Sequence, residues 1–291
     1  MERGNTMICF VILHYQAEQE TVNCINNIKE KVQSAKKIVV VDNASPNGSG
    51  EYLQKRYDSD SEVEIVLLDK NLGFAKGNNW GFRVAKKYAP DFVVVMNNDV
   101  LLEQEDIVFR IERAYERNRF DVLGPDIFST KANIHQNPQR IKNYTLHELV
   151  QTKRKLHFKN KYKFLLKLKY LLYKKETDKR KQNIDYTKEA YDVPLHGACY
   201  IFSKDFIKTH NNCFYNKTFM YYESYILHYL GKREGLSFVY CPDIKVLHHE
   251  DIATNQTYSK IYNKVIFVNK CLEESCQCFI DVMNDPNIKI G

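Results

Sequence analysis

The stretch VVVMNNDVLL, residues 93–102, places three polar side chains at the end of an apolar run. An apolar run of this length that is bounded by polar residues is typical of a buried strand. Asn97, Asn98 and Asp99 therefore mark the end of a strand that the protein interior covers. Because an unpaired carboxylate is costly to bury, Asp99 requires a partner that compensates its charge.

Strand and helix patterns alternate through the first half of the chain. Apolar runs predict strands at residues 7–13, 36–42, 63–69 and 91–99, and helical patterns cover 18–32, 48–57, 73–88 and 103–117, with Ser49 as an N-cap. This alternation predicts an α/β fold with a mostly parallel, Rossmann-like sheet flanked by helices. Ligands of such sheets bind at the carboxyl ends of strands, where Asp42, Asn71 and Asp99 lie.

The second half of the chain is less regular. Residues 133–190 are polar and basic, and we interpret them as a helical insertion. Beyond them the pattern predicts a loop, strand and short helix over 195–207, a helix over 219–235, two separate strands over 236–242 and 244–250, and a helical tail from about Tyr258. We therefore divide the chain into four parts, 1–132, 133–190, 191–255 and 256–291.

Composition and charge indicate an ordinary globular protein with one unusual segment. The 291 residues are 44% hydrophobic and 27% charged. Residues 153–181 contain 13 Lys and Arg against Glu176 and Asp178, a net charge of +11, so the rest of the chain carries −4 of the total +7. No run approaches ~20 apolar residues, no secretory signal is visible, and the eight cysteines form no C-x-x-C pair. We expect a cytoplasmic protein with reduced thiols.

The sequence lacks the main motifs of two common classes of nucleotide-binding protein. The sequence has no G-x-x-x-x-G-K-[ST] and no G-x-G-x-x-G after the first strand, which argues against P-loop NTPases and dinucleotide-dependent oxidoreductases. A strand-terminal acid with polar neighbours remains. This arrangement suits Mg²⁺ or Mn²⁺, which proteins hold with one or two oxygen ligands while substrate phosphate supplies others.

Five stretches in this order carry a family resemblance: VILHYQ (11–16), VVVDNAS (39–45), KNLGFAKGNNWG (70–81), VVVMNNDV (93–100) and HGACYIFSK…FMYYE…VLHHE (196–250). With them the chain resembles family 2 glycosyltransferases of the GT-A fold, of the rhamnosyltransferase-like kind that assembles surface or capsular polysaccharide. The resemblance implies a metal-assisted, inverting transfer from a UDP- or dTDP-sugar to a lipid-linked saccharide acceptor. It also implies a location at the inner face of the cell membrane.

The resemblance assigns a role to each part of the chain. Residues 1–132 become the nucleotide-sugar half and 191–255 the acceptor half with the base. The donor site falls on Tyr15, Asp42, Asn71, Gly73, Gly77, Asn78, Asn97 and Asn98. Two structural alternatives stay open: DNAS is favourable turn chemistry for Asp42, and the glycines also suit helix entry and close packing.

The metal ligands implied by the resemblance are Asp99 and His248. NND stands where the family has D-x-D, so Asn97 replaces the first acid and Asp99 keeps the second. His249 competes with His248, since adjacent residues of a strand face opposite sides. A buried structural aspartate and a structural histidine remain as alternatives.

Glu223 matches the first acid of the family's base motif, whereas Ser224 and Ile226 stand where many relatives have acids. It is the only carboxylate between Asp205 and Glu234, so the assignment has no local rival. One carboxylate suffices to take the proton of an acceptor hydroxyl. The alternative is a charge that favours a helix N-terminus. His196 and Gly197 align with the stretch that approaches the acceptor, and a tight turn is their structural alternative.

The basic segment 153–181 interleaves lysines with bulky apolar residues. At ~100° per residue, Lys163, Lys167 and Lys174 share one side of a helix, and Phe158, Tyr162, Leu165 and Leu172 share the other. This pattern is typical of a helix on an anionic membrane surface, and a solvated helix packed on the domain is the alternative. No nucleic-acid reader motif accompanies the charge, so we expect no nucleic-acid partner.

Two further function classes remain open at this stage. A sugar-nucleotide nucleotidyltransferase usually has a glycine-rich basic loop after its first strand, and LHYQAEQE offers neither glycine nor a basic residue there. A weakened, nucleotide-sugar-binding relative is suggested by Asn97, Ser224 and Ile226. Release of free nucleoside diphosphate, with and without acceptors, distinguishes these classes from a glycosyltransferase.

Overall fold

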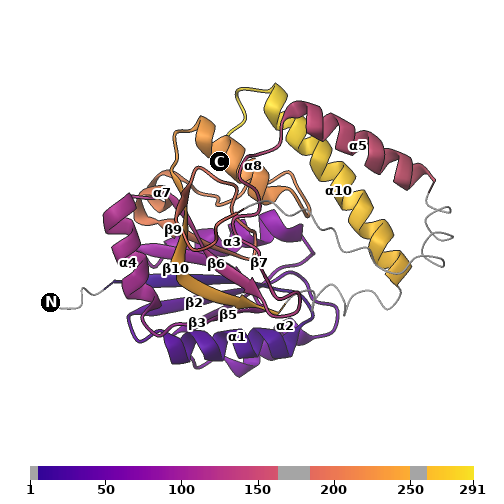
Figure 1. Cartoon of the computed structure of the whole chain (residues 1–291). Helices are drawn as coiled ribbons and strands as arrows, with labels where there is room; N and C mark the ends of the chain where they lie inside the picture. Colours follow the sequence, from indigo (N-terminus) through magenta and orange to yellow (C-terminus); the bar gives the residue numbers. More distant parts are fainter. Residues whose placement is uncertain (1–5, 163–183, 250–260) are drawn as a thin grey trace.

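The first half of the chain builds the parallel part of one sheet (Figure 1). A computed structural model describes residues 6–162, 184–249 and 261–291. In it β1 pairs in parallel with β2 and β4, and β2 pairs in parallel with β3. The bounds are Ile8–His14 for β1, Lys36–Asp42 for β2, Val63–Leu67 for β3 and Phe92–Asn97 for β4. The predicted Rossmann-like half is therefore present.

The second half of the chain extends the same sheet in the order β3-β2-β1-β4-β9-β6-β10-β5. Strand β9 is antiparallel to both neighbours, β10 is parallel to β6, and the short β5 is antiparallel to β10. Two short strands, β7 and β8, pair with β6 and β10. The bounds are Val100–Leu102 for β5, Val122–Ser129 for β6, Ile134–His135 for β7, Ala190–Tyr191 for β8, Cys199–Ser203 for β9 and Phe238–His248 for β10.

Helices cover both faces of the sheet, and each face has its own apolar core. On one face lie α1 (Glu18–Lys31), α2 (Ser49–Arg56) and α4 (Ile107–Asn118). On the other lie α3 (Gly73–Lys86), α7 (Lys204–Thr209) and α8 (Glu223–Arg233). Figure 1 shows α1 and α2 below the strands and α3 and α8 above them. The predicted α/β class with a mostly parallel sheet is confirmed, and the antiparallel strands of the second half make the sheet mixed.

Helices α5 (Leu146–Lys161) and α10 (Ile261–Asn284) lie side by side at one end of the molecule (Figure 1). A capping box formed by Thr145 and Glu148 starts α5. Buried Leu149 and Leu156 attach α5 to the core that also contains the C-terminal half of α10. The helical tail is thus present. Within the part of the chain described, no helix has the length and apolarity needed to cross a membrane.

The basic segment is described only up to residue 162. Residues 153–161 belong to α5, where Lys153 bonds Gln277 and His157 pairs with Glu273 of α10. Phe158 is 60% exposed, so part of the apolar side of α5 faces solvent. Lys163, Lys167 and Lys174, with Leu165 and Leu172, lie outside the described residues.

Two local predictions were wrong. Ser49 does not cap α2: the N-cap is Gly48 in a left-handed conformation, and the Ser49 hydroxyl instead contacts His14 and Asn47. The two predicted strands over 236–242 and 244–250 are one strand, β10, which passes Pro242. A shift of register between Cys241 and Lys245 accommodates the proline, because a bulge removes the need for its missing N–H.

All eight cysteines lie in described parts of the chain and are free thiols. Seven are buried, and burial raises the pKa of the Cys9 thiol to about 12. The seven buried cysteines therefore act as small apolar side chains.

We predict that Gly81→Ala destabilises the fold although alanine is the better helix former. A Cβ at Gly81 would overlap a Val11 methyl group and lie 2.9 Å from Cγ2 of Val41, where α3 meets the sheet. Overpacking costs more than the ~1 kcal/mol gained in helix propensity, so we expect a net loss of roughly 1–2 kcal/mol. Urea denaturation measures it, with exposed Lys76→Ala on the same helix as control. Equal or greater stability of Gly81→Ala would show that the interface can relax.

Candidate functional site

The carboxyl ends of three parallel strands meet at one edge of the sheet. The register pairs His14 with Asp42 across β1 and β2, and Leu13 with Asn97 across β1 and β4. The predicted donor-site residues lie at the ends of β2 and β4 (Asp42, Asn97), just after β1 and β4 (Tyr15, Asn98), just before α3 (Asn71) and within α3 (Gly73, Gly77, Asn78). The sequence-based expectation that these side chains gather at one edge is therefore met by the topology.

Asp42 is buried and closes the turn after β2. Its carboxylate accepts hydrogen bonds from the backbone N–H of Ser45, at 3.2 and 3.3 Å, and from the Ser45 hydroxyl. Gly50 leaves room for it, since a Cβ there would overlap the carboxylate. His14 Nε2 lies 3.8 Å away, and burial lowers the pKa of His14 to about 4 despite the nearby Asp42. The turn predicted from DNAS is thus present.

Asn43, which the sequence reasoning missed, joins the ends of β2 and α3. Its amide nitrogen donates to Asn71 Oδ1 at 3.0 Å and to the Gly73 carbonyl at 3.3 Å, and its oxygen accepts from the Leu72 N–H at 2.8 Å. An asparagine next to a strand-terminal aspartate was the only available signal. Asn43 holds Asn71 and Gly73 in place.

Both predicted glycines are required by close approach. Gly73 has a φ of +78°, and a Cβ there would overlap the carbonyl oxygen of Phe219. A Cβ on Gly77 would lie 2.5 Å from a Leu13 methyl group. Asn78 is 1% exposed and donates to the Phe74 carbonyl, but its Oδ1 accepts no hydrogen bond from any residue described. The glycines thus permit the close packing that was their structural alternative. The side-chain oxygen of Asn78 has no hydrogen-bond donor among the described residues.

Asp99 and His248 are brought together by the antiparallel pairing of β5 and β10. His248 is opposite Val100 in the register, so it lies beside the residue that follows Asp99. His248 Nε2 is 3.3 Å from Asp99 Oδ1, and both residues are less than a tenth exposed. His249 is exposed, and its backbone N–H donates to the Asp99 carbonyl at 2.9 Å. Of the two candidate histidines, His248 therefore places its ring beside the Asp99 carboxylate.

The Asp99–His248 pair has the chemistry of an incomplete cation site. Asp99 Oδ1 makes no hydrogen bond to any residue described, although it lies within ion-pair distance of the imidazole. Carboxylate and imidazole are ligands that Mn²⁺ accepts, and substrate phosphate oxygens complete such sites. No group of three or more His, Cys, Asp or Glu side chains suited to a metal occurs among the residues described. The donor set of this pair would therefore suit two of the ligands of a divalent ion.

The two asparagines before Asp99 differ in their availability. Asn98 is 6% exposed, and its amide nitrogen donates to Thr21 Oγ1 at 3.0 Å, so it joins β4 to α1. Asn97 is half-buried, and its backbone N–H donates to the Ala198 carbonyl at 2.9 Å. Tyr15 is also half-buried at the end of β1. Asn98 thus has a structural role, whereas the side chains of Asn97 and Tyr15 remain partly accessible.

Glu223 is the first residue of α8 and is 7% exposed. Burial raises the pKa of its carboxyl to about 7, and its Oε1 has no hydrogen-bond partner within the described chain. The two residues before it, Tyr221 and Tyr222, have φ values of +78° and +64°. Such strain in bulky residues persists only where surrounding structure enforces it, and it clusters at functional sites. Ser275 of α10 helps to hold this turn, since its hydroxyl donates to the Met220 carbonyl at 2.7 Å.

The turn at 196–198 connects these groups. The His196 ring lies 5.9 Å from the His248 ring, and the Ala198 carbonyl accepts the Asn97 N–H. A Cβ on Gly197 would lie 3.2 Å from Ser224 Oγ, next to Glu223. Burial lowers the pKa of His196 to about 3, so this imidazole is neutral. One short turn thus lies against His248, the NND stretch and the start of α8.

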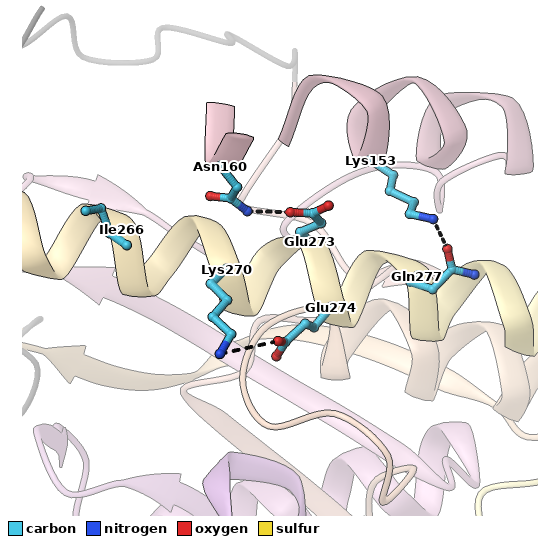
Figure 2. Close-up of a pocket in the computed structure, with 7 residues that line it drawn as sticks. All are labelled: Lys153, Asn160, Ile266, Lys270, Glu273, Glu274 and Gln277. Carbon is cyan, nitrogen blue, oxygen red and sulfur yellow. Dashed lines mark hydrogen bonds and ion pairs between the residues drawn. The ribbon is translucent and has the colours of Figure 1, made fainter. Parts of the chain in front are cut away.

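A separate pocket lies between α5 and α10 and contains none of the predicted site residues (Figure 2). Its polar side chains are paired with one another: Lys153 with Gln277, Asn160 with Glu273, and Lys270 with Glu274. These six side chains already bond one another, so the pocket is a weaker candidate for a ligand site. The strand ends remain the candidate site.

Two known proteins are similar to this chain in sequence. "Low-salt glycan biosynthesis hexosyltransferase Agl10" of Haloferax volcanii is 21% identical over 276 residues, which cover 92% of this chain and 77% of that protein. "Glycosyltransferase GlyG" of Streptococcus pneumoniae serotype 4 is 23% identical over 118 residues, which cover 40% of this chain and 38% of that protein.

Solved structures show the same fold. The crystal structure of S. aureus TarS 1–349 matches 97% of this chain and 71% of its own, with a TM-score of 0.52 and 13% identity. The same protein in complex with UDP matches 91% of this chain and 65% of its own, with a TM-score of 0.51 and 11% identity. The predicted GT-A type of α/β fold is confirmed.

The sequence profile described as "Glycosyl transferase family 2" matches residues 9–180. This match covers more than half of the chain and includes β1, the DNAS turn, the glycine-containing start of α3 and the NND stretch. The chain therefore belongs to glycosyl transferase family 2.

Proposed function

We propose that this family 2 glycosyltransferase transfers a sugar, with inversion, from a UDP- or dTDP-sugar to a saccharide acceptor. The observation that carries the proposal is a pair of buried carboxylates with separate environments. Asp99 lies 3.3 Å from an imidazole nitrogen, and Glu223 at the start of α8 is buried, with its pKa raised to about 7. These environments suit a metal ligand and a general base, respectively.

Each carboxylate has one task in this proposal. Asp99 and His248 would hold Mn²⁺ or Mg²⁺, which neutralises the charge of the diphosphate leaving group when it is bound. Glu223 takes the proton of the acceptor hydroxyl as that oxygen attacks the anomeric carbon from the face opposite the diphosphate. A pKa near 7 suits a base that works near neutral pH.

The donor is the part of the proposal with most support. UDP is named in one of the similar solved structures, and a hexosyltransferase is named among the relatives. In our proposal Asn71, Gly73, Gly77 and Asn78 line the donor site, with Tyr15 and Asn97 beside it. We also assign Asp42, at the end of β2, to the base or ribose of the donor.

For the acceptor we propose a lipid-linked saccharide of surface polysaccharide synthesis, reached at the inner face of the cell membrane. We assign His196 and Gly197 to the acceptor side, because a Cβ on Gly197 would lie 3.2 Å from Ser224 Oγ, next to Glu223. The support is the +11 charge of residues 153–181 and the exposed Phe158 on the described part of that segment. A basic segment with exposed apolar side chains is attracted to anionic lipid.

We predict that Asp99→Asn weakens the binding of Mn²⁺ and of nucleoside diphosphate together, because the substitution removes the one charged ligand of the pair. We expect at least about a tenfold loss, measured by calorimetry with UDP or dTDP in Mn²⁺ and in EDTA. Asp121→Asn is the matched control. Asp121 is half-buried at the opposite end of β6 and already accepts the Ser237 N–H at 2.9 Å, so its change should leave both affinities unchanged. Diphosphate binding that is equally tight in EDTA contradicts the metal assignment.

We predict that Glu223→Gln lowers the rate of transfer by about 10²–10⁴-fold and leaves donor affinity nearly unchanged. In the wild type the rate should rise with pH through about 7, as the Glu223 carboxyl loses its proton. Release of nucleoside diphosphate in the presence of acceptor measures both. Turnover within a few-fold of the wild type would place the base elsewhere.

Glu223→Gln should lower activity, but we predict that it raises the stability of the fold. The folded pKa of about 7 exceeds the ordinary value of 4.5, so the wild type loses stability as pH rises between these values. Glu223→Gln removes this penalty. Above pH ~7 the variant should be more stable by roughly 2–4 kcal/mol, and the gain should vanish below pH ~4.5. Thermal unfolding across this range checks that lost activity is not lost folding.

We predict that changing Lys163, Lys167 and Lys174 to Glu abolishes co-sedimentation with anionic liposomes at low salt. Each basic residue near the surface contributes on the order of 1 kcal/mol, and salt screens the attraction. Transfer to a short soluble acceptor should persist. Exposed Lys55, Lys87 and Lys208 changed to Glu give the same net charge and should leave sedimentation intact. Sedimentation of the first triple variant, or none by the wild type, contradicts membrane docking.

A further inference from the structure

We propose that Gln136 is a positioning residue that fixes the ring of His248 with its proton on Nδ1, so that the Nε2 lone pair faces Asp99. The inference rests on the proposed function for its consequence, which is metal binding by Asp99 and His248. It concerns a residue from the start of the insertion 133–190, which the sequence reasoning assigned no part in the site.

The contact itself is direct. Gln136 Oε1 lies 2.7 Å from His248 Nδ1, on the side of the ring opposite the 3.3 Å approach of Nε2 to Asp99 Oδ1. A carbonyl oxygen only accepts hydrogen bonds, so Nδ1 donates, and a neutral imidazole then has a bare lone pair on Nε2. Metal-binding histidines are commonly oriented in this way by an acceptor behind the ring.

The facing atoms need a cation between them. The Nε2 lone pair and the Asp99 carboxylate are both electron-rich, and Asp99 Oδ1 has no hydrogen bond within the described residues. Two such acceptors at 3.3 Å repel unless a positive charge joins them. His248 and Asp99 would together hold a divalent ion, which would supply that positive charge. With the opposite arrangement of the proton, Nε2–H would occupy the carboxylate and block the site.

The backbone around Gln136 is anchored firmly enough for this task. The Gln136 N–H donates to the Ile127 carbonyl at 2.8 Å, next to the β6–β7 pairing. Asn137 is fully buried, donates to the Pro125 carbonyl at 2.7 Å and accepts the His196 N–H at 2.9 Å. Adjacent residues of one segment therefore support His248 and His196.

The experiment compares three substitutions. Gln136→Leu removes the acceptor, and Gln136→Glu keeps an acceptor of similar length. Gln151→Leu is the matched control, because Gln151 also bonds a histidine, His147 at 2.7 Å, but on the exposed surface of α5. Mn²⁺ affinity in the presence of UDP is measured by electron paramagnetic resonance. The proton position on His248 is read from long-range ¹H–¹⁵N spectra without metal, at about pH 8, where imidazole is ordinarily neutral.

We expect Gln136→Leu to weaken Mn²⁺ binding by about 10–100-fold and to lose the Nδ1–H form. Gln136→Glu and Gln151→Leu should retain both. Wild-type affinity in Gln136→Leu, a loss in Gln136→Glu equal to that in Gln136→Leu, or an Nε2–H form in the wild type each overturns the inference. If the wild type shows the Nδ1–H form but binds no Mn²⁺, the proposed metal step fails while the positioning role stands.

Discussion

Two buried carboxylates set the main physical constraint on this structure. Asp99 and Glu223 are 8% and 7% exposed, and each has an oxygen with no hydrogen bond to a described residue. Desolvation of a carboxylate is expensive, and at Glu223 it appears directly as a pKa raised to about 7. The remaining stability of two apolar cores, one on each face of the sheet, must offset this cost. The burial of these two carboxylates thus lowers the stability of the fold, as is common at functional sites.

The directions of the strands explain how distant segments reach one edge. Strand β9 is antiparallel to β4, so its first residue, Cys199, pairs with Met96 near the end of β4. The turn at 196–198 therefore lies beside Asn97. Strand β10 is parallel to β6 and antiparallel to β5, which brings His248 to Asp99. The reversal of strand direction in the second half of the sheet thus places the turn at 196–198 and His248 beside the ends of the parallel strands.

Much of the fold could be predicted because its signals are local. Apolar runs and helical periodicity located the strands and helices of the first half, and the order of motifs indicated the family. The wrong predictions concern places where contacts between residues far apart in the sequence determine the local structure. Ser49 bonds His14 rather than its own helix, and β10 continues past Pro242 because its neighbour β6 supports it across a bulge. Asn43 and Gln136 escaped notice because the partners that give them a role are far away in sequence or follow from loop geometry.

The sequence by itself determined the α/β class, the strand-terminal position of Asp99 and the candidacy of Glu223, since each depends on residue type and spacing along the chain. Only the tertiary structure decided that His248 rather than His249 lies beside Asp99, that Asn98 is used to join β4 to α1, and that Tyr221 and Tyr222 hold Glu223 through a strained turn. These outcomes depend on strand register and on burial. Both are set by contacts between segments that lie far apart along the chain, which local sequence patterns do not contain.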